Sequence, residues 1–396
     1  MSPYPSRVPL AVPCWNGQTY RAALRAIFRG RTVAGPEVEQ LKSLILSRID
    51  VADALLCGSG SLALEIVLAS CGIGPGNEVV IPSFCCTAIV PPIVNLGAVP
   101  VFTDVGEELN TTAAAVDDAL TLKTKAVIVP HLFGNPAEIE AIEKIARAKN
   151  ISVIDDAAQA LGATIDGRAA GSFGDAGVVS FGAEKICFGV GGGAAVSRRE
   201  GFFAGTELPR PRRASATRNF SSTLFRRRWR RWTFPLDSLL PDKAEPDEPP
   251  LSYRREEMAN VSAAVALTLA RTLDANIAAR RERVRMYRAL LGSAERLQLI
   301  AHRPGSACLT QVVRVLPRRP REDAAARAID ALRADGYEVQ GSYMPIHLLP
   351  AYERWRRRSL PNTEEVWPDL IELPCEPEVS LRDAELIAGL VLRTIK

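Results

Sequence analysis

Between residues 51 and 197, short apolar runs alternate with stretches of helical character, and this alternation restricts the possible folds more than any other feature. The apolar runs predict strands at residues 54–57, 78–81, 99–102, 126–129, 152–154, 177–181 and 194–196. Between several of them, helices are predicted at residues 61–70, 86–96, 113–120 and 137–148. Because the runs are continuously apolar, both faces of the sheet should be covered by helices. The sequence therefore predicts an α/β fold with a mostly parallel mixed sheet, whose ligands bind at the carboxyl ends of the strands.

The chain has 396 residues, which is enough for two domains. We expect a large domain at residues 1–255, with an excursion rich in arginine and tryptophan at about 200–250. We expect a smaller C-terminal α+β domain at residues 256–396, which begins with one long helix, or two in series, over residues 256–291. Its further elements are predicted as strands at 308–316 and 338–341 and helices at 321–335 and 381–394.

Net charge, cysteine spacing and apolar run length argue against a nucleic-acid-binding, metal-binding or membrane-spanning protein. The formal net charge of +4 is small for this length and does not suggest a nucleic-acid-binding protein. Eight cysteines occur without a Cys-x-x-Cys pair, and three histidines occur without zinc-type spacing, so no metal site is predicted. Prolines interrupt the N-terminal segment, and no apolar run reaches the roughly 18 residues of a membrane span. These features favour a cytoplasmic location.

Three polar motifs follow predicted strands. Lys185 ends the run SFGAEK just before the glycines of residues 189–193, Asp155 and Asp156 precede Gln159, and residues 58–61 read Gly-Ser-Gly-Ser. Together they supply an amine for a Schiff base, a carboxylate for a ring nitrogen and a phosphate cradle, which are what pyridoxal phosphate requires. Taken singly, each motif has an ordinary reading as a solvated lysine or a helix N-cap.

The motifs assign a role to each candidate residue. Lys185 is the predicted Schiff-base and proton-transferring residue, and Asp156 is the predicted partner of the ring nitrogen. Of the two acids we choose Asp156, because it stands three residues before Gln159, which would then reach the ring hydroxyl. The phosphate is assigned to the helix start that follows the glycines and to nearby hydroxyl groups, namely Ser59, Gly60, Ser61 and Ser180.

Further motifs extend this pattern over nearly the whole chain. They lie at residues 32–39, 72–84, 96–104, 131–134, 154–163, 171–176, 343–347 and 373–374. This ordered series resembles the DegT/StrS-type family of aminotransferases, which have the aspartate aminotransferase-like (type I) pyridoxal-phosphate fold. The resemblance implies amino transfer, usually from glutamate, to the keto group of a nucleotide-linked sugar. It also implies a homodimer whose active sites are shared. A branch with histidine at the Schiff-base position catalyses dehydration instead, so Lys185 favours transamination.

Four departures from the family pattern affect the predicted site. Cys86 stands where the family stacks an aromatic ring on the cofactor, and Phe84 is the candidate to compensate. The loop after Lys185 reads Val-Gly-Gly-Gly over residues 190–193, where the family has Gly-Asp-Gly-Gly. Arg255 and Glu257 replace the asparagine and arginine that usually reach the neighbour's phosphate, although Arg255 or Arg254 could still meet it. The segment 225–234 has no family counterpart that we recognise.

Several functional readings stay open at this point. The arginines and tryptophans of Arg226 to Trp232 are read as a solvated excursion, as a contact for an acidic ligand, or as a peripheral membrane contact. His131, His347 and Tyr343 are candidate substrate contacts, with core or interface packing as the alternative for the histidines. Alternatives to sugar amination are a lyase or dehydratase, a non-sugar or lipid-linked acceptor, and a non-catalytic binding or regulatory homologue.

Overall fold

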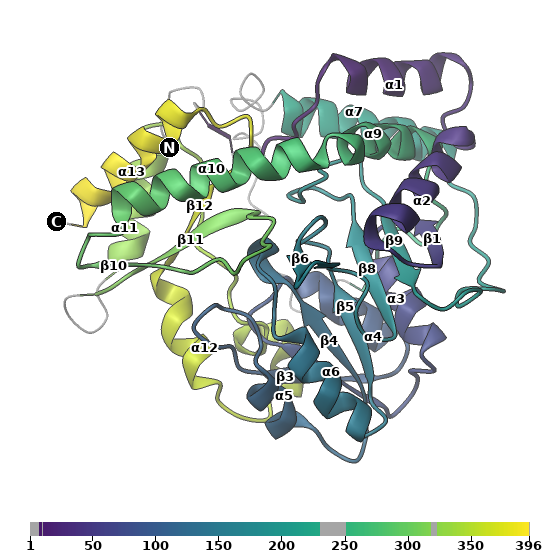
Figure 1. Ribbon diagram of the computed structural model, residues 1–396, viewed down its shortest axis with the longest axis horizontal. Coiled ribbons are helices and arrows are strands. Elements are labelled where there is room, and N and C mark those ends of the chain that lie inside the picture. The colour runs from purple at the N-terminus through teal and green to yellow at the C-terminus, as the bar shows by residue number, and fades with distance from the viewer. Residues whose placement is uncertain (1–7, 10, 230–250, 318–322, 396) are drawn as a thin grey trace.

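A seven-stranded sheet forms the centre of the computed structural model, which describes residues 8–9, 11–229, 251–317 and 323–395 (Figure 1). Its strands are β1 (Asp53–Cys57), β2 (Glu78–Pro82), β3 (Val99–Thr103), β4 (Thr124–Pro130), β5 (Ser152–Asp156), β8 (Ala176–Ser180) and β9 (Gly193–Ser197). They lie in the order β1-β9-β8-β5-β4-β2-β3, and only β9 runs antiparallel to its neighbours. The predicted α/β fold with a mostly parallel sheet is confirmed.

Helices cover both faces of this sheet, as the continuous apolar strands required. Along β4, Ala126 and Ile128 join the core under α3 (Gly60–Ser70) and α4 (Val90–Asn95), whereas Val127 and Val129 join the core under α5 (Ala113–Ala119) and α6 (Ile139–Ala148). The helix predicted at 86–96 is a 3₁₀ turn, Thr87–Ile89, followed by α4. Pro91 and Pro92 stand in the first turn of α4, where their missing N–H groups leave no hydrogen bond unmade.

A second, three-stranded antiparallel sheet lies beside the first. It consists of β10 (Leu297–Leu299), β11 (Thr310–Val315) and β12 (Leu370–Pro374), and shares a core with α10 (Leu273–Leu291), α11 (Ala324–Ala334) and α13 (Leu381–Thr394). The strand predicted at 338–341 is wrong. After the turn at Gly336, only Gln340 of that segment pairs, in an isolated bridge with Glu372 of β12, while Glu338 N donates to Val8 O (2.9 Å), so no continuous ladder forms.

The N-terminal helices pack against a helix from the other half of the sequence. Helices α1 (Gly17–Phe28) and α2 (Pro36–Ile49), which the sequence patterns did not reveal, both contact α9 (Asn260–Arg271). The predicted long segment 256–291 is thus two helices, α9 and α10, separated at Thr272. A domain boundary at residue 256 stays a prediction, since α9 shares its core with α1 and α2.

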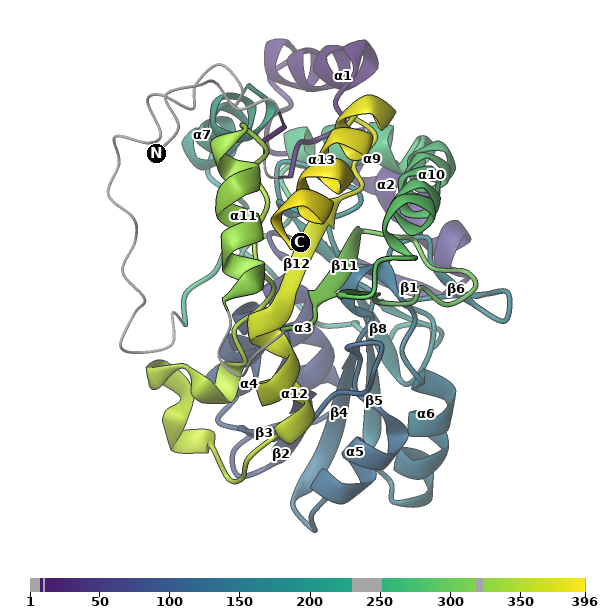
Figure 2. The ribbon, with the colours of Figure 1, turned by 90° about the vertical axis from the view of Figure 1, so that its left-hand side faces the viewer.

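The remaining elements are short or lie on the outside. They are β6 (Thr164–Ile165), β7 (Arg168–Ala169), α7 (Arg213–Thr223) with the π-helical turn Leu224–Arg228, α12 (Pro361–Val366), and the 3₁₀ turns Leu132–Gly134, Ile346–Leu348, Pro350–Trp355 and Trp367–Asp369. Seen from the side, α11, α12 and α13 lie together beside the large sheet (Figure 2). None of the helices in the described ranges combines the length and hydrophobicity that crossing a bilayer requires.

Candidate active site

A cavity of about 230 Å³ opens where several strands of the large sheet end. The loops after β1, β2, β5 and β8 each contribute to its lining, as expected for an open α/β sheet. Eight of the predicted site residues line it: Lys185, Asp156, Gln159, Ser59, Gly60, Ser61, Ser180 and Cys86. Residues that come from four separate stretches of sequence are therefore brought to one place.

One end of the cavity has the groups that bind an anion. Ser59 is the N-cap of α3 and accepts a hydrogen bond from the N–H of Leu62 at 3.1 Å. The N–H groups of Gly60 and Ser61 lie in the first turn of this eleven-residue helix, where they have no intrahelical acceptor. A Cβ at Gly60 would lie 3.0 Å from the Oγ of Ser180, so glycine keeps the hydroxyl and the helix start close together.

Arg254 adds a positive charge to this end. It lines the cavity, and a Cβ on Gly191 (φ +104°) would overlap its guanidinium. Its segment is held by hydrogen bonds from Gly58 N to Glu256 O (2.8 Å) and from Ser59 Oγ to Arg254 O (3.4 Å). Burial lowers the pKa of Arg254, and the side chain makes no ion pair within the described part of the chain. Glu256 is the acid whose charge acts on Arg254, but the two form no direct ion pair in the described residues, so the half-buried guanidinium favours an anionic ligand.

Arg255, the other candidate for the phosphate, points elsewhere. Its guanidinium pairs with the nearly buried Glu65, which also accepts from the hydroxyl of Tyr253. The side chain of Arg255 does not line the cavity. The two neighbouring arginines therefore have different surroundings, which the sequence did not distinguish.

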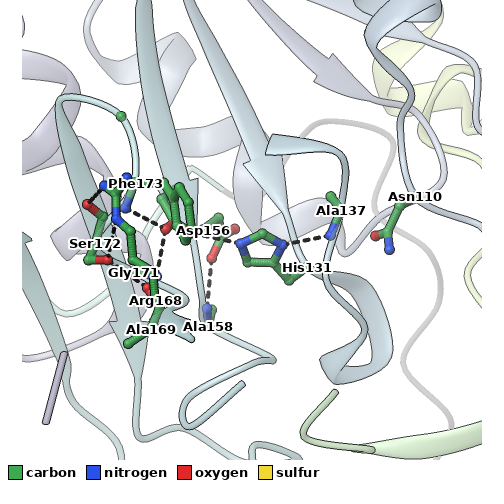
Figure 3. A network of polar contacts seen from close by, with 12 residues as sticks. Asn110, His131, Ala137, Asp156, Ala158, Arg168, Ala169, Gly171, Ser172 and Phe173 are labelled. Carbon is green, nitrogen blue, oxygen red and sulfur yellow. Dashed lines mark hydrogen bonds and ion pairs between the residues drawn. The ribbon is translucent and has the colours of Figure 1, made fainter. Parts of the chain in front are cut away.

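The two adjacent aspartates also differ in their surroundings. Asp155 is fully buried and accepts hydrogen bonds from Gly171 N (2.6 Å), Phe173 N (2.9 Å) and the Nε2 of His131 (2.8 Å). His131 accepts in turn from Ala137 N at its Nδ1 (2.9 Å), so Nε2 carries the proton (Figure 3). All the hydrogen bonds that Asp155 accepts thus come from groups in the protein interior.

Asp156, at the end of β5, is the aspartate that lines the cavity. One of its oxygens accepts from Ala158 N at 2.9 Å, as Figure 3 shows. Burial raises the pKa of Asp156, while this N–H donor and the positive charge of Lys185 act in the opposite direction. A carboxylate in this environment gains from a cationic partner such as a protonated ring nitrogen.

Lys185 is half-buried in the loop between β8 and β9, and that loop is anchored on several sides. Glu184 has a left-handed backbone (φ +63°) and forms an ion pair with Arg227 at 3.2 Å. Beyond the lysine, Phe188 O accepts from the indole Nε1 of Trp15 at 2.9 Å. These contacts fix the backbone on both sides of the amine.

Gln159 connects the cavity to a smaller one of about 50 Å³. Its Oε1 accepts from Phe133 N (2.9 Å), and its Nε2 donates to the hydroxyl of Tyr343 (3.0 Å). Tyr343 and Glu372 both line this second cavity. Burial raises the pKa of Glu372 to about 7, despite hydrogen bonds from Ser342 and Gln340. Tyr343 therefore lies next to the site rather than in the main cavity.

Phe84 and the two histidines lie away from the cavity. Phe84 is fully buried, with its ring 6.2 Å from that of Phe133 and 6.0 Å from that of Tyr343, so it is not positioned to replace the missing aromatic ring. His131 is fully buried with both nitrogens bonded. His347 is bonded to Ser83 (2.5 Å) and Glu364 (2.9 Å). These placements do not support the cofactor contact expected of Phe84 or the substrate contacts expected of the histidines.

The lining fits pyridoxal phosphate. An amine (Lys185), a carboxylate with a raised pKa (Asp156) and an anion-binding end with a helix start and a guanidinium share one cavity. Apolar walls are supplied by Ile89, Leu64 and Val178. Within the described ranges, no cluster of histidine, cysteine, aspartate and glutamate is arranged to hold a metal ion.

Comparison with known proteins places the chain among aminotransferases. The sequence profile of the DegT/DnrJ/EryC1/StrS aminotransferase family matches residues 16–391. GDP-perosamine synthase of Caulobacter vibrioides is 29% identical over 342 residues, which are 85% of this chain and 84% of that protein. UDP-N-acetyl-3-dehydro-alpha-D-glucosamine 3-aminotransferase of Acidithiobacillus ferrooxidans is 38% identical over 165 residues, or 41% of this chain and 45% of that protein. The aminotransferase TlmJ of Streptoalloteichus hindustanus superimposes with a TM-score of 0.76 at 26% identity, over 98% of both chains.

Proposed function

The chain belongs to the DegT/DnrJ/EryC1/StrS aminotransferase family, and from this premise we propose that it transfers an amino group from glutamate to the keto group of a nucleotide-linked sugar. The names of both curated relatives refer to nucleotide-linked sugars. The second of them aligns over less than half of its own length, so the substrate class rests mainly on the relative that aligns over 84%. We propose a role in polysaccharide or natural-product biosynthesis, in the cytoplasm, as a homodimer with shared sites.

Pyridoxal phosphate is the cofactor of this family, and when bound it supplies an aldehyde that exchanges with amines and a ring that accepts an electron pair. We assign its phosphate to the helix start of Ser59–Ser61, the hydroxyl of Ser180 and the guanidinium of Arg254. We assign its ring nitrogen to Asp156. Gln159 is the proposed neighbour of the ring hydroxyl, since it lies three residues beyond Asp156 and lines the same cavity.

Lys185 and Asp156 have distinct proposed roles. The Nζ of Lys185 would hold the cofactor through its aldehyde carbon and, when free of it, would carry a proton to and from the substrate carbon. The carboxylate of Asp156 keeps the ring nitrogen protonated, and its burial makes that ion pair stronger than it would be in water. The arrangement of these two groups in one cavity is the observation that carries the proposal.

Amino transfer can be tested in two half-reactions. Glutamate added to the yellow holoenzyme should convert the cofactor to its amine form and release 2-oxoglutarate. A panel of nucleotide-linked keto sugars should then restore the yellow form. Lys185→Ala should abolish both half-reactions, whereas Lys144→Ala, an exposed lysine on α6, should leave them unchanged. Absence of the glutamate half-reaction in a holoenzyme that binds cofactor would exclude transamination from glutamate.

A second candidate, elimination, is favoured by one observation. Cys86 lines the cavity at the position where the family stacks an aromatic ring. Elimination would consume a sugar without releasing the amine form of the cofactor, so the same two half-reactions separate the candidates. We also propose the peripheral membrane contact predicted for Arg226 to Trp232, of which residues 230–232 lie outside the described residues.

A further inference from the structure

Acidic residues are absent from two long segments of the chain. Residues 1–36 contain five arginines and residues 208–236 contain nine, and neither segment contains an aspartate or a glutamate. The whole chain carries a formal net charge of only +4, so its positive charge is concentrated in these two segments. The described parts of both segments lie at one end of the molecule, where α1 and α7 are adjacent in both views (Figures 1 and 2).

Helix α1 has an outward face on which arginines alternate with large apolar side chains. Arg21, Leu24, Arg25 and Phe28 are spaced so that they share one side of the helix, and all four are exposed. Leu24 is 44% exposed and Phe28 is 83% exposed. The opposite side, with Ala23 and Ala26, is buried against α9. Leu24 and Phe28 therefore lie on the side of α1 that faces away from α9.

The second segment continues the same end of the molecule. Trp15, just before α1, stacks on Phe220 of α7 with ring centroids 5.9 Å apart, and its carbonyl accepts from Arg228 at 3.5 Å. In the turn that follows α7, Phe225 is 50% exposed and Trp229 is 39% exposed. We call the residues Arg21, Leu24, Arg25, Phe28, Arg29, Arg218, Phe225 and Trp229 the α1–α7 face.

Four arginines of the α1–α7 face have no acidic partner among the residues that the structure describes. Arg21, Arg25, Arg29 and Arg218 are exposed and make no ion pair within the described ranges. Arg227 and Arg228, by contrast, pair with Glu184 and Glu378 and hold the segment against the body. Within the described part of the chain, the four exposed arginines can thus bind an external anion, and the paired ones fix the face in place.

We propose that the α1–α7 face docks on a bilayer surface that contains anionic phospholipids. Arginine beside phenylalanine, leucine and tryptophan suits the headgroup layer, where the rings and aliphatic side chains enter the acyl boundary and the guanidinium groups bind phosphates. Nucleic acid would use the arginines but would gain nothing from Leu24. A two-fold contact through this face would offer its arginines no acidic partner, because residues 1–36 and 208–236 contain no aspartate or glutamate. This inference is independent of the proposed amino transfer.

Vesicle flotation of the full-length protein tests the proposal. The wild type should float with vesicles of phosphatidylglycerol and phosphatidylcholine and not with phosphatidylcholine alone. Each arginine near an anionic surface changes the partition about fivefold, so Arg21→Gln/Arg25→Gln/Arg29→Gln should lower it about a hundredfold. Leu24→Ser/Phe28→Ser should also lower it, since it removes the two exposed apolar side chains. Both variants alter exposed positions and should keep the folded state and the cofactor content of the wild type.

Matched controls lie at the other end of the molecule, near α6 (Figure 1). Lys144→Gln/Arg147→Gln/Lys149→Gln removes the same number of positive charges, and Leu122→Ser removes a fully exposed leucine. Neither should change flotation. Equal losses in the α6 control would mean that total charge alone is sensed, and would overturn the proposal. A changed sedimentation coefficient in Leu24→Ser/Phe28→Ser would indicate contact between copies and would also overturn the proposal. Unchanged flotation of this variant would indicate a general polyanion site, with the same consequence.

Discussion

Replacing Arg254 should weaken phosphate binding specifically. The guanidinium lies against Gly191 at the anion-binding end of the cavity, with a pKa lowered by burial. A hydrogen bond to a charged group contributes about 1.5–3 kcal/mol. At about 1.4 kcal/mol per tenfold change, Arg254→Gln should raise the dissociation constant of pyridoxal phosphate about 10- to 150-fold. Gly191→Ala should act in the same direction, because its new methyl group would displace the guanidinium.

Two comparisons make this measurement specific: pyridoxal phosphate with pyridoxal, and Arg254 with Arg255. Pyridoxal phosphate and pyridoxal differ only in the phosphate, so titration of the apoenzyme with both separates a phosphate contact from a general loss of the site. Pyridoxal affinity should be unchanged in Arg254→Gln. Arg255→Gln removes the same charge one residue away, but that side chain pairs with Glu65 and should affect neither ligand.

The apoenzyme offers a readout that does not depend on catalysis. Inorganic phosphate should stabilise wild-type apoenzyme against heat in proportion to its occupancy, and Arg254→Gln should lose most of this stabilisation. The reasoning is refuted if Arg254→Gln binds pyridoxal phosphate as tightly as the wild type. It is also refuted if both ligands lose affinity equally, because the arginine would then act on the cavity as a whole.

Three further changes test individual parts of the site. Burial raises the pKa of Glu372 from 4.5 to about 7, so its contribution to stability falls as pH rises through that interval. Relative to wild type, Glu372→Gln should gain about 3 kcal/mol by pH 8 and only about 0.4 kcal/mol at pH 4.5, as measured by denaturant unfolding at several pH values. His131→Ala should cost about 1–3 kcal/mol by leaving the buried Asp155 short of a donor, and a raised KM with unchanged stability would instead support a substrate contact. Cys86→Phe should restore ring stacking worth about 0.5–1.5 kcal/mol and tighten cofactor binding about 2- to 12-fold in equilibrium dialysis, and weaker binding would show that the cavity has no room for the ring.

The sheet and the positions of its loops could be predicted because they depend on local patterns. Continuous apolar runs at residues 126–129 and 152–154 indicated strands buried on both faces, and parallel strands end at one edge. That rule places Asp156 at the same edge of the sheet as residues 58–61, although two strands lie between β1 and β5. The choice between Asp155 and Asp156 was made from spacing, and the structure places Asp156 at the cavity and Asp155 in the interior.

Other features depend on contacts distant in sequence and left no local signal. His131 ends a strand at the ligand edge, yet Asp155 and Ala137 together bind both of its nitrogens inside the protein. Whether Arg254 or Arg255 faces the cavity is decided by which of them meets Glu65, some 190 residues earlier in the chain. The segment 338–341 has the composition of a strand, but Glu338 bonds to Val8 and only Gln340 pairs with β12.

The pairing of α1 and α2 with α9 has a consequence for how the chain acquires its structure. During synthesis the two N-terminal helices leave the ribosome more than 200 residues before the helix that covers them. Until then Leu41, Ile45 and Ile49, which are almost completely buried in the finished protein, can pack only against earlier elements such as β1 and β7, and stay partly open to chaperones. A fragment cut at residue 255 would keep every strand of the large sheet and still lack the helix that closes its core. The nascent chain thus commits to its native state only when its final third is made.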